Sequence, residues 1–170
     1  NREFFENEPV LLIHADNWCQ CDFSEFLGFH SLRRPSGTSI TMMTFRTSSP
    51  TTCGIVEVDG KGVVQNFHEK IEDPPGNLAN GAVYVLEPEV SAWIGERRFV
   101  KDFSTQVIPH FLGRIATWEN QGIHRDIGMI RSLLVAQSDP QPVSCWDTSD
   151  GWSRAFESHP VHHQLVSELN

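Results

Sequence analysis

The chain has 170 residues, 39% of them hydrophobic, which is enough to bury one globular core without disulfides or structural metals. Its 22 acidic and 13 basic side chains give a formal net charge of −9, and no run of Lys or Arg occurs. We therefore expect no nucleic-acid partner, because binding a phosphate backbone requires clustered positive charge. No apolar stretch is long enough to cross a membrane, so no membrane partner is expected either.

Cysteine usage indicates a reduced, cytoplasmic protein. The four cysteines, at positions 19, 21, 53 and 145, lack the dense spacing of small disulfide-stabilised domains. Cys19 and Cys21 form a Cys-x-Cys pair that could bind a metal, although the chain has no second pair at ligand spacing.

The first 45 residues predict a strand, a helix and a second strand. The apolar run 10–13 is typical of a strand buried on both faces, as inside a parallel sheet. Asp22 is placed to cap a helix whose apolar residues repeat from Phe23 to His30 at helical spacing, with His30 on the buried face. The β-branched and apolar segment 38–45 predicts a strand parallel to the first.

A β-hairpin and a further strand are expected next. Segments 53–58 and 62–67 alternate on either side of an Asp-Gly-Lys turn, which favours a hairpin. A proline-rich loop leads to a buried strand at 82–86, and Pro88 suits the first turn of a helix ending near Gly95.

The remaining pattern predicts a helix at 103–112 capped by Asp102, a strand at 114–118 and a helix at 129–137. We therefore predict an α/β fold with a mixed, mostly parallel sheet flanked by helices. Residues 1–138 would form this domain. Residues 139–170 would be a C-terminal extension, because Pro140 and Pro142 break the regular pattern.

Two carboxylates stand next to predicted strands. Asp16 follows the first strand directly, at the end where open α/β sheets bind ligands, although an Asp there can equally be a turn residue or helix cap. Asp126 lies between a strand and the last helix, so it could cap that helix instead. If the two meet, they could hold one Mg²⁺, which takes one or two carboxylates together with phosphate oxygens and water.

Other polar positions suit a phosphorylated sugar. Glu69 and Lys70 end the hairpin's second strand, and both side chains can reach one ligand only if the strand twists or ends there. Lys suits phosphate and Glu suits sugar hydroxyls, whereas an isolated Glu-Lys pair is ordinarily solvated. Asn80-Gly81 and Gly54 mark either tight turns or places where the backbone approaches a ligand closely.

Five segments, taken in order, resemble the sugar-phosphate nucleotidylyltransferases, particularly the mannose-1-phosphate and heptose-1-phosphate guanylyltransferase type. The resemblance covers about residues 9–137. The matching segments are Val-Leu-Leu-Ile-His-Ala-Asp-Asn at 10–17, Cys-Gly-Ile-Val at 53–56, Phe-His-Glu-Lys at 67–70, Asn-Gly-Ala-Val-Tyr-Val at 80–85 and Asp-Ile-Gly at 126–128. The fourth is similar to the family's Asn-Ala-Gly-Ile-Tyr, and the fifth to its closing Trp-x-Asp-x-Gly.

The resemblance implies a Rossmann-like nucleotide-diphospho-sugar transferase fold and a Mg²⁺-dependent reaction. A nucleotidyl group would pass from a nucleoside triphosphate to a sugar 1-phosphate, with release of pyrophosphate. The implied catalytic residues are Asp16, Lys70 and Asp126, with Asp16 and Asp126 as the metal ligands. The implied substrate-binding residues are Asn17, Gly54, Glu69, Asn80 and Gly81. A homo-oligomer is left open.

The chain also departs from the family pattern. Ala15 replaces a Gly, Ile71 replaces a Pro, and His124 stands where Trp is commoner. The family's N-terminal strand and Gly-rich loop have no counterpart, so the fold is expected to be incomplete at the N-terminus. We expect this segment alone to be inactive and about a hundred further residues to precede it. The alternative is a catalytically silent regulatory or scaffold subunit.

Overall fold

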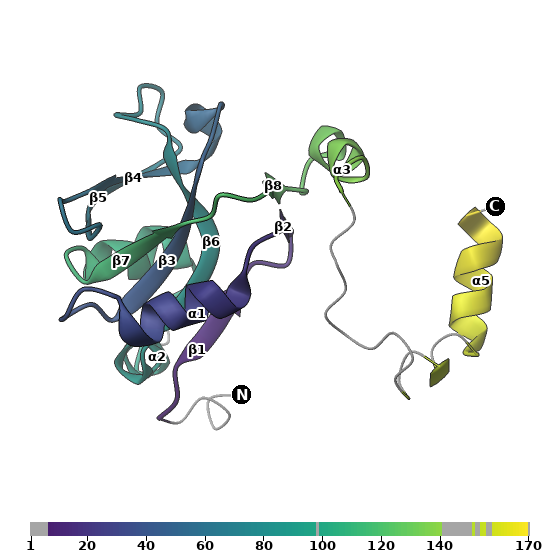
Figure 1. Cartoon of the computed structure of the whole chain (residues 1–170), viewed down its shortest axis with the longest axis horizontal. Helices are drawn as coiled ribbons and strands as arrows, with labels where there is room; N and C mark the ends of the chain where they lie inside the picture. The colour runs from purple at the N-terminus through teal and green to yellow at the C-terminus, as the bar shows by residue number, and fades with distance from the viewer. Residues whose placement is uncertain (1–6, 98, 141–150, 152–153, 156–157, 170) are drawn as a thin grey trace. The chain divides into compact units, whose positions relative to one another are not determined.

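A computed structural model describes residues 7–97, 99–140, 151, 154–155 and 158–169 (Figure 1). The chain divides into two compact units, residues 1–138 and 139–170. In the second unit the described part is mainly helix α5 (Pro160–Leu169). No helix among the described residues combines the length and the apolarity needed to span a membrane.

The first unit is built on one mixed sheet, six-stranded within the described part of the chain. Its order is β5 (Val64–Glu69), β4 (Gly54–Val58), β6 (Leu78–Leu86), β3 (Ile40–Arg46) and β7 (Ile115–Glu119). Strand β1 (Val10–Ile13) pairs with the last four residues of β6, and a short 3₁₀ turn, η2 (Pro50–Thr52), precedes β4. The α/β class with a mixed sheet is confirmed.

Strand β6 explains how this sheet differs from a parallel one. It runs antiparallel to both β1 and β3, so those two strands share a direction, as predicted, but are not neighbours. Among the described strand pairs of the sheet, β3–β7 is the parallel one. The expectation of mostly parallel neighbours is therefore wrong. Strands β1 and β3, which α1 connects, are separated in the sheet by one strand. That strand is β6, which comes later in the sequence.

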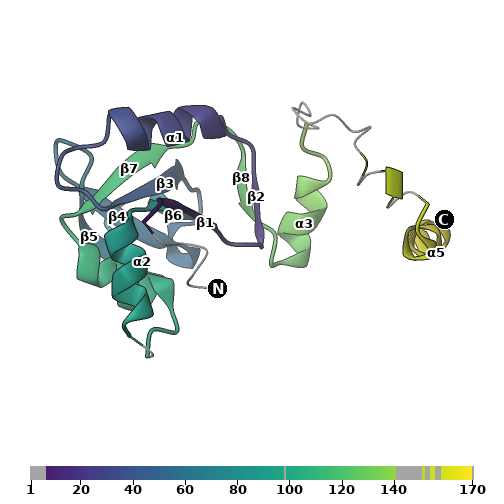
Figure 2. The same cartoon turned by 90° about the horizontal axis from the view of Figure 1, so that it is seen from below.

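Two helical layers cover the sheet on opposite faces, as Figure 2 shows for α1 and α2. Helix α1 (Phe23–Leu32) begins where the Asp22 carboxylate accepts a hydrogen bond from the Glu25 backbone at 2.9 Å, and it buries Phe26 and His30. Helix α2 (Pro88–Gly95) starts at Pro88, as predicted. The apolar core therefore lies in two layers, one on each side of the sheet.

Two predicted elements take a different form. The helix expected at 103–112 is a π turn, η3 (Phe103–Val107), followed by a 3₁₀ turn, η4 (Ile108–Phe111), because Pro109 has no N–H to donate to a regular helix. Asp102 still caps the first turn, accepting from the Thr105 backbone at 2.6 Å. Strand β1 is only half-buried, and Ile13 is 44% exposed. The pairing that the structure describes for β1 is with β6, along one of its two edges.

A small second sheet joins two segments that lie far apart in the sequence. Strand β2 (Asn17–Cys19) pairs antiparallel with β8 (His124–Asp126), and helix α3 (Ile130–Ala136) follows β8. The ladder joins residues more than a hundred positions apart in sequence. It brings the segment after β1 next to the segment before α3.

Candidate functional site

The two predicted metal ligands lie side by side. In the β2–β8 ladder, Asn17 is opposite Asp126, and the Ile127 backbone N–H donates to the Asp16 carbonyl at 2.8 Å. Asp126 Oδ1 accepts from the Gly128 backbone at 2.8 Å. The convergence predicted from two distant segments is therefore present in the structure.

Gly128 leaves room between the carboxylates. A β-carbon at that position would stand 3.0 Å from Asp126 Oδ1 and 3.9 Å from Asp16 Oδ2. Carboxylate oxygens of two residues thus face one small space that a side chain would fill. Asp126 is not a helix cap, because α3 begins at Ile130 with Met129 at its N-cap position.

The donor set suits Mg²⁺ better than a metal that needs a complete protein cage. Within the described residues, no three His, Cys, Asp or Glu side chains converge on one point. Mg²⁺ usually keeps several waters and binds one or two carboxylates together with substrate phosphates. Asp16 and Asp126 are the residues that could hold it.

The Gly81 carbonyl connects the carboxylate segments to the main sheet. It accepts from Asn17 Nδ2 at 3.1 Å and from His124 Nε2 at 2.8 Å. A β-carbon on Gly81 would meet the Met43 carbonyl oxygen at 3.0 Å and His124 Nε2 at 3.2 Å. A side chain at this position would press on β3 and β8, so glycine suits the close approach of β3, β6 and β8.

The environment of His124 favours the neutral form of its imidazole ring. Burial lowers its pKa, and its Nε2–H donates to Gly81 while Nδ1 is buried without a partner. The ring stacks on Phe45 with the centroids 4.1 Å apart and the planes 17° from parallel. An imidazolium would need an acceptor at Nδ1, so the packing favours the uncharged form.

Asn80 sits in a bulge of β6 rather than in a turn before it. Met42 is opposite Tyr84 while Thr44 is opposite Asn80, so β6 carries extra residues here. The bulge places Ala82 in the left-handed region, at φ +50°, and its N–H donates to Asn80 Oδ1 at 3.0 Å. Asn80 Nδ2 donates to the Tyr84 hydroxyl at 2.7 Å.

Tyr84 is a central residue that the sequence pattern alone did not single out. It is fully buried, and burial is the main cause of its raised pKa, with the charges of Glu69 and Asp102 adding to the effect. The His14 ring meets it edge-on with the centroids 6.3 Å apart. The sequence did contain one signal for Tyr84, which is its place as the fifth residue of the family-like segment Asn-Gly-Ala-Val-Tyr.

The second group of predicted residues forms around the end of the hairpin. Gly54 is opposite Glu69, and a β-carbon on Gly54 would stand 2.9 Å from Glu69 Oε2. Strand β5 ends at Glu69, and Lys70 has φ +50°, which brings its Nζ to 3.8 Å from Glu69 Oε1. The strand end therefore lets Glu69 and Lys70 act on one ligand.

The predicted residues thus form two groups with Asn80 between them. Asp16, Asn17, Gly81 and Asp126 make the first, and Gly54, Glu69 and Lys70 make the second. Antiparallel pairing of Ile55 with Ala79 puts Gly54 beside Asn80, and Asn80 precedes Gly81 directly. All eight predicted residues therefore belong to one connected part of the molecule.

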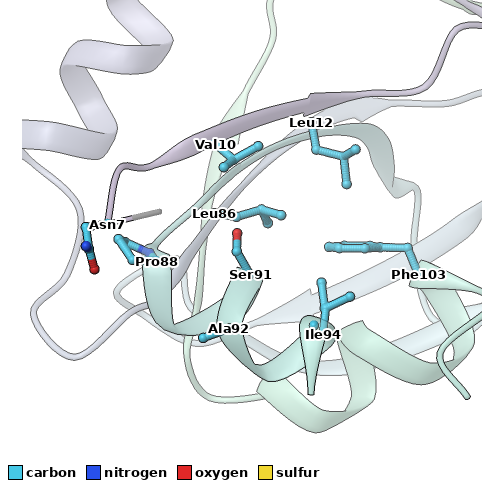
Figure 3. Close-up of a pocket in the computed structure, with 10 residues that line it drawn as sticks. Asn7, Val10, Leu12, Leu86, Pro88, Ser91, Ala92, Ile94 and Phe103 are labelled. Atoms are coloured by element: carbon cyan, nitrogen blue, oxygen red, sulfur yellow. The ribbon is translucent and has the colours of Figure 1, made fainter. Parts of the chain in front are cut away.

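A large cavity lies elsewhere. It measures about 670 Å³ and is lined mainly by apolar side chains of β1, the end of β6, α2 and η3, including Leu12, Leu86, Ile94 and Phe103 (Figure 3). Among the residues that the structure describes, none that lines it is charged, and none is one of the eight predicted residues. Its surface does not suit a phosphorylated substrate.

Comparison with known proteins identifies the family. The family model described as nucleotidyl transferase matches residues 1–141, so the chain belongs to the nucleotidyl transferase family. The glucose-1-phosphate adenylyltransferase of Clostridium acetobutylicum is 26% identical over 155 residues, which cover 82% of this chain and 39% of that protein. A Sulfolobus acidocaldarius protein assigned as a mannose-1-phosphate guanyltransferase is 23% identical over 134 residues, covering 79% and 36%.

The fold has a solved counterpart. A Bacillus anthracis protein assigned as a glucose-1-phosphate thymidylyltransferase, crystallised with sucrose, superposes with a TM-score of 0.69 at 18% identity, over 84% of this chain and 60% of that one. The resemblance to sugar-phosphate nucleotidyltransferases is confirmed at the level of family and fold. The chain spans less than two fifths of the length of the two curated relatives named above.

Proposed function

We propose that this chain supplies the metal-binding and sugar-phosphate side of a sugar-1-phosphate nucleotidylyltransferase. The observation that carries the proposal is that carboxylate oxygens of Asp16 and Asp126 lie 3.9 and 3.0 Å from the position of a β-carbon on Gly128. Curated relatives whose names denote adenylyl and guanylyl transfer to sugar 1-phosphates support it.

In the proposed reaction, an oxygen of the sugar phosphate attacks the α-phosphorus of a nucleoside triphosphate in line. The new O–P bond forms as the bond to the bridging oxygen breaks, and pyrophosphate leaves. Bound Mg²⁺ would neutralise the phosphate charge that develops in this transfer. Asp16 and Asp126 would orient the substrate phosphates through the ion, and positioning would supply much of the catalysis.

Lys70 and Glu69 are suited to the acceptor. The Lys70 side chain is 64% exposed and ends in a compact positive charge, which suits the sugar phosphate. Glu69 offers carboxylate oxygens to sugar hydroxyls, and Gly54 lets that carboxylate pack against β4, because a β-carbon would stand 2.9 Å from Glu69 Oε2. The amides of Asn80 and Asn17, both half-buried, would complete the sugar-binding surface beside Gly81.

The first test measures metal binding by the 170-residue chain. Titration with Mn²⁺, followed by electron paramagnetic resonance, should detect one site that Mg²⁺ displaces. Asp16→Asn and Asp126→Asn should each lower the affinity at least roughly tenfold, because each removes half of the carboxylate pair. Asp73→Asn changes an exposed loop carboxylate and serves as the matched control. Unchanged affinity in both site variants would refute the metal site.

The second test concerns the chemistry. A protein that contains this chain together with the remaining length of its relatives should release pyrophosphate from a nucleoside triphosphate, Mg²⁺ and a sugar 1-phosphate. Lys70→Ala should raise the KM for the sugar phosphate more than it lowers kcat. Metal and sugar-phosphate binding without turnover would instead favour the silent regulatory or scaffold alternative.

A further inference from the structure

Three sulfur-bearing side chains pack together in the apolar layer on the α1 side of the sheet. Cys19 lies on β2, Cys21 lies between β2 and α1, and Met43 lies on β3. Cys19 Sγ is 3.6 Å from Met43 Sδ, and the Cys19 and Cys21 side chains are hydrogen-bonded to each other. The sulfurs come from three separate elements, so the fold assembles them.

Their surroundings are largely apolar. Met43 is fully buried in the core layer on the α1 side of the sheet, and both cysteines pack against that layer. The cysteines are partly exposed, which leaves an approach from solvent. A site of this kind excludes most competing oxygen ligands and favours a weakly hydrated ion.

The two thiols differ in their hydrogen-bond environments. The Asn120 side-chain amide donates to Cys19 Sγ at 3.5 Å. The hydrogen bond from Cys21 holds the pKa of Cys19 below its ordinary value and raises that of Cys21. Binding of Cu(I) by both cysteines would release the two thiol protons to water and leave two thiolates as ligands.

The number and type of ligands select the ion. Soft thiolate and thioether sulfurs prefer Cu(I) among biological metals, whereas structural zinc sites are almost always four-coordinate. Three sulfurs placed about 2.3 Å from one ion in a trigonal plane stand about 4 Å apart. The observed 3.6 Å between Cys19 and Met43 is close to that spacing.

We propose that Cys19, Cys21 and Met43 form a three-sulfur binding site for a soft monovalent cation, with Cu(I) the best fit. The site does not depend on the proposed nucleotidyl transfer. The Cys-x-Cys spacing showed only two of the ligands, because Met43 lies 24 residues from Cys19 on another strand.

The test is an anaerobic titration of the reduced chain with Cu(I) in competition with the chromophoric chelator bicinchoninate. We expect one tightly bound Cu(I) per chain. Cys19→Ser and Cys21→Ser should each weaken binding by at least roughly a hundredfold, and Met43→Leu, which conserves volume, by roughly tenfold. X-ray absorption should report three sulfur neighbours near the copper.

Cys53→Ser combined with Cys145→Ser is the matched control, because it removes the other two thiols of the sequence. This control variant should bind Cu(I) as the wild type does. Melting curves of every variant without metal separate lost binding from lost folding. The proposal fails if the control abolishes binding, if Cys19→Ser leaves it unchanged, or if Met43→Leu leaves both the affinity and the sulfur count unchanged.

A second readout uses the position of the site. An ion shared by Cys19 and Met43 would tie β2 to β3, in addition to the hydrogen bonds that pair β2 with β8. Amide hydrogen exchange at residues 17–19 and 124–126 should therefore slow when Cu(I) is added. Unchanged exchange there would mean that the copper binds outside this cluster, which would contradict the proposal.

Discussion

Replacing Ala82 by Gly should relieve strain in the bulge of β6. Ala82 has φ +50°, where the β-carbon of an L-residue lies too close to its own carbonyl oxygen. The family motif that the segment 80–84 resembles, Asn-Ala-Gly-Ile-Tyr, has Gly at this third position. In this chain Gly comes one residue earlier, at position 81, where a β-carbon would stand 3.0 Å from the Met43 carbonyl oxygen.

The change in the free energy of unfolding can be worked out by comparing alanine and glycine in the conformation found at position 82. The left-handed conformation costs a non-glycine residue about 1–2 kcal/mol, and glycine loses roughly 0.5–1 kcal/mol more conformational entropy than alanine on folding. The balance is a stabilisation of about 0.5–1 kcal/mol, which corresponds to roughly 1–4 °C in Tm for a chain of this size. Because Ala82→Gly also removes a partly buried methyl group, we expect a stabilisation near the lower end of this range.

The measurement is urea unfolding of Ala82→Gly beside Ala79→Gly. Ala79 lies in the same strand and is fully buried, without a positive φ, so its replacement should destabilise the chain by at least about 0.5–1 kcal/mol. The two free energies of unfolding should therefore differ by about 1–2 kcal/mol in favour of Ala82→Gly. Equal destabilisation by both variants would refute the strain at Ala82.

Three further outcomes are expected. Gly54→Ala places a β-carbon 2.5 Å from the Phe67 ring and 2.9 Å from the Glu69 carboxylate, so it should cost about 1–3 kcal/mol in urea unfolding and weaken binding of a sugar 1-phosphate in calorimetry; wild-type values for both would contradict this crowding. Gly128→Ala should lower Mn²⁺ affinity with little change in Tm, because it fills the space between the two carboxylates; unaltered affinity would place the ion elsewhere. His124 has a lowered pKa in the folded chain, so the unfolded chain binds more protons below about pH 6.5 and stability should fall as the pH drops through that window. His124→Gln should flatten part of this slope in melting curves between pH 5 and 8, and an identical slope would show that His124 is not its source.

Local patterns in the sequence predicted the local structure well. The capped helix α1, the β4–β5 hairpin and the start of α2 each depend on contacts within a few residues, such as the bond from Asp22 to Glu25. The position of β6 between β1 and β3 depends on pairing between residues at least 32 positions apart, such as Arg46 with Leu78, which periodicity does not reveal. The irregular η3–η4 segment follows from Pro109, whose effect is local but was outweighed by the apolar spacing around it.

For the candidate site, too, the sequence predicted some features and only the structure revealed others. Asp16 and Asp126 were identified because each stands next to a strand in a segment that resembles a family motif. The contacts that hold them together, such as the Ile127 bond to the Asp16 carbonyl, join backbone atoms that any residue possesses. Residue types alone therefore do not encode these contacts, and the role of Gly128 became visible only with both carboxylates in place.

The shared Gly81 carbonyl gives the proposed metal and sugar sides a physical connection. Its two donors lie next to the carboxylates: Asn17 follows Asp16, and His124 is two residues before Asp126. A ligand that shifts the Asn80 bulge moves this carbonyl, so it must either carry both donors along or break one hydrogen bond at a cost of about 0.5–1.5 kcal/mol. Since the stacked His124 ring and the β2–β8 ladder resist separate movement, carrying both donors is the easier response. Binding of the sugar phosphate would then reposition the two carboxylates together.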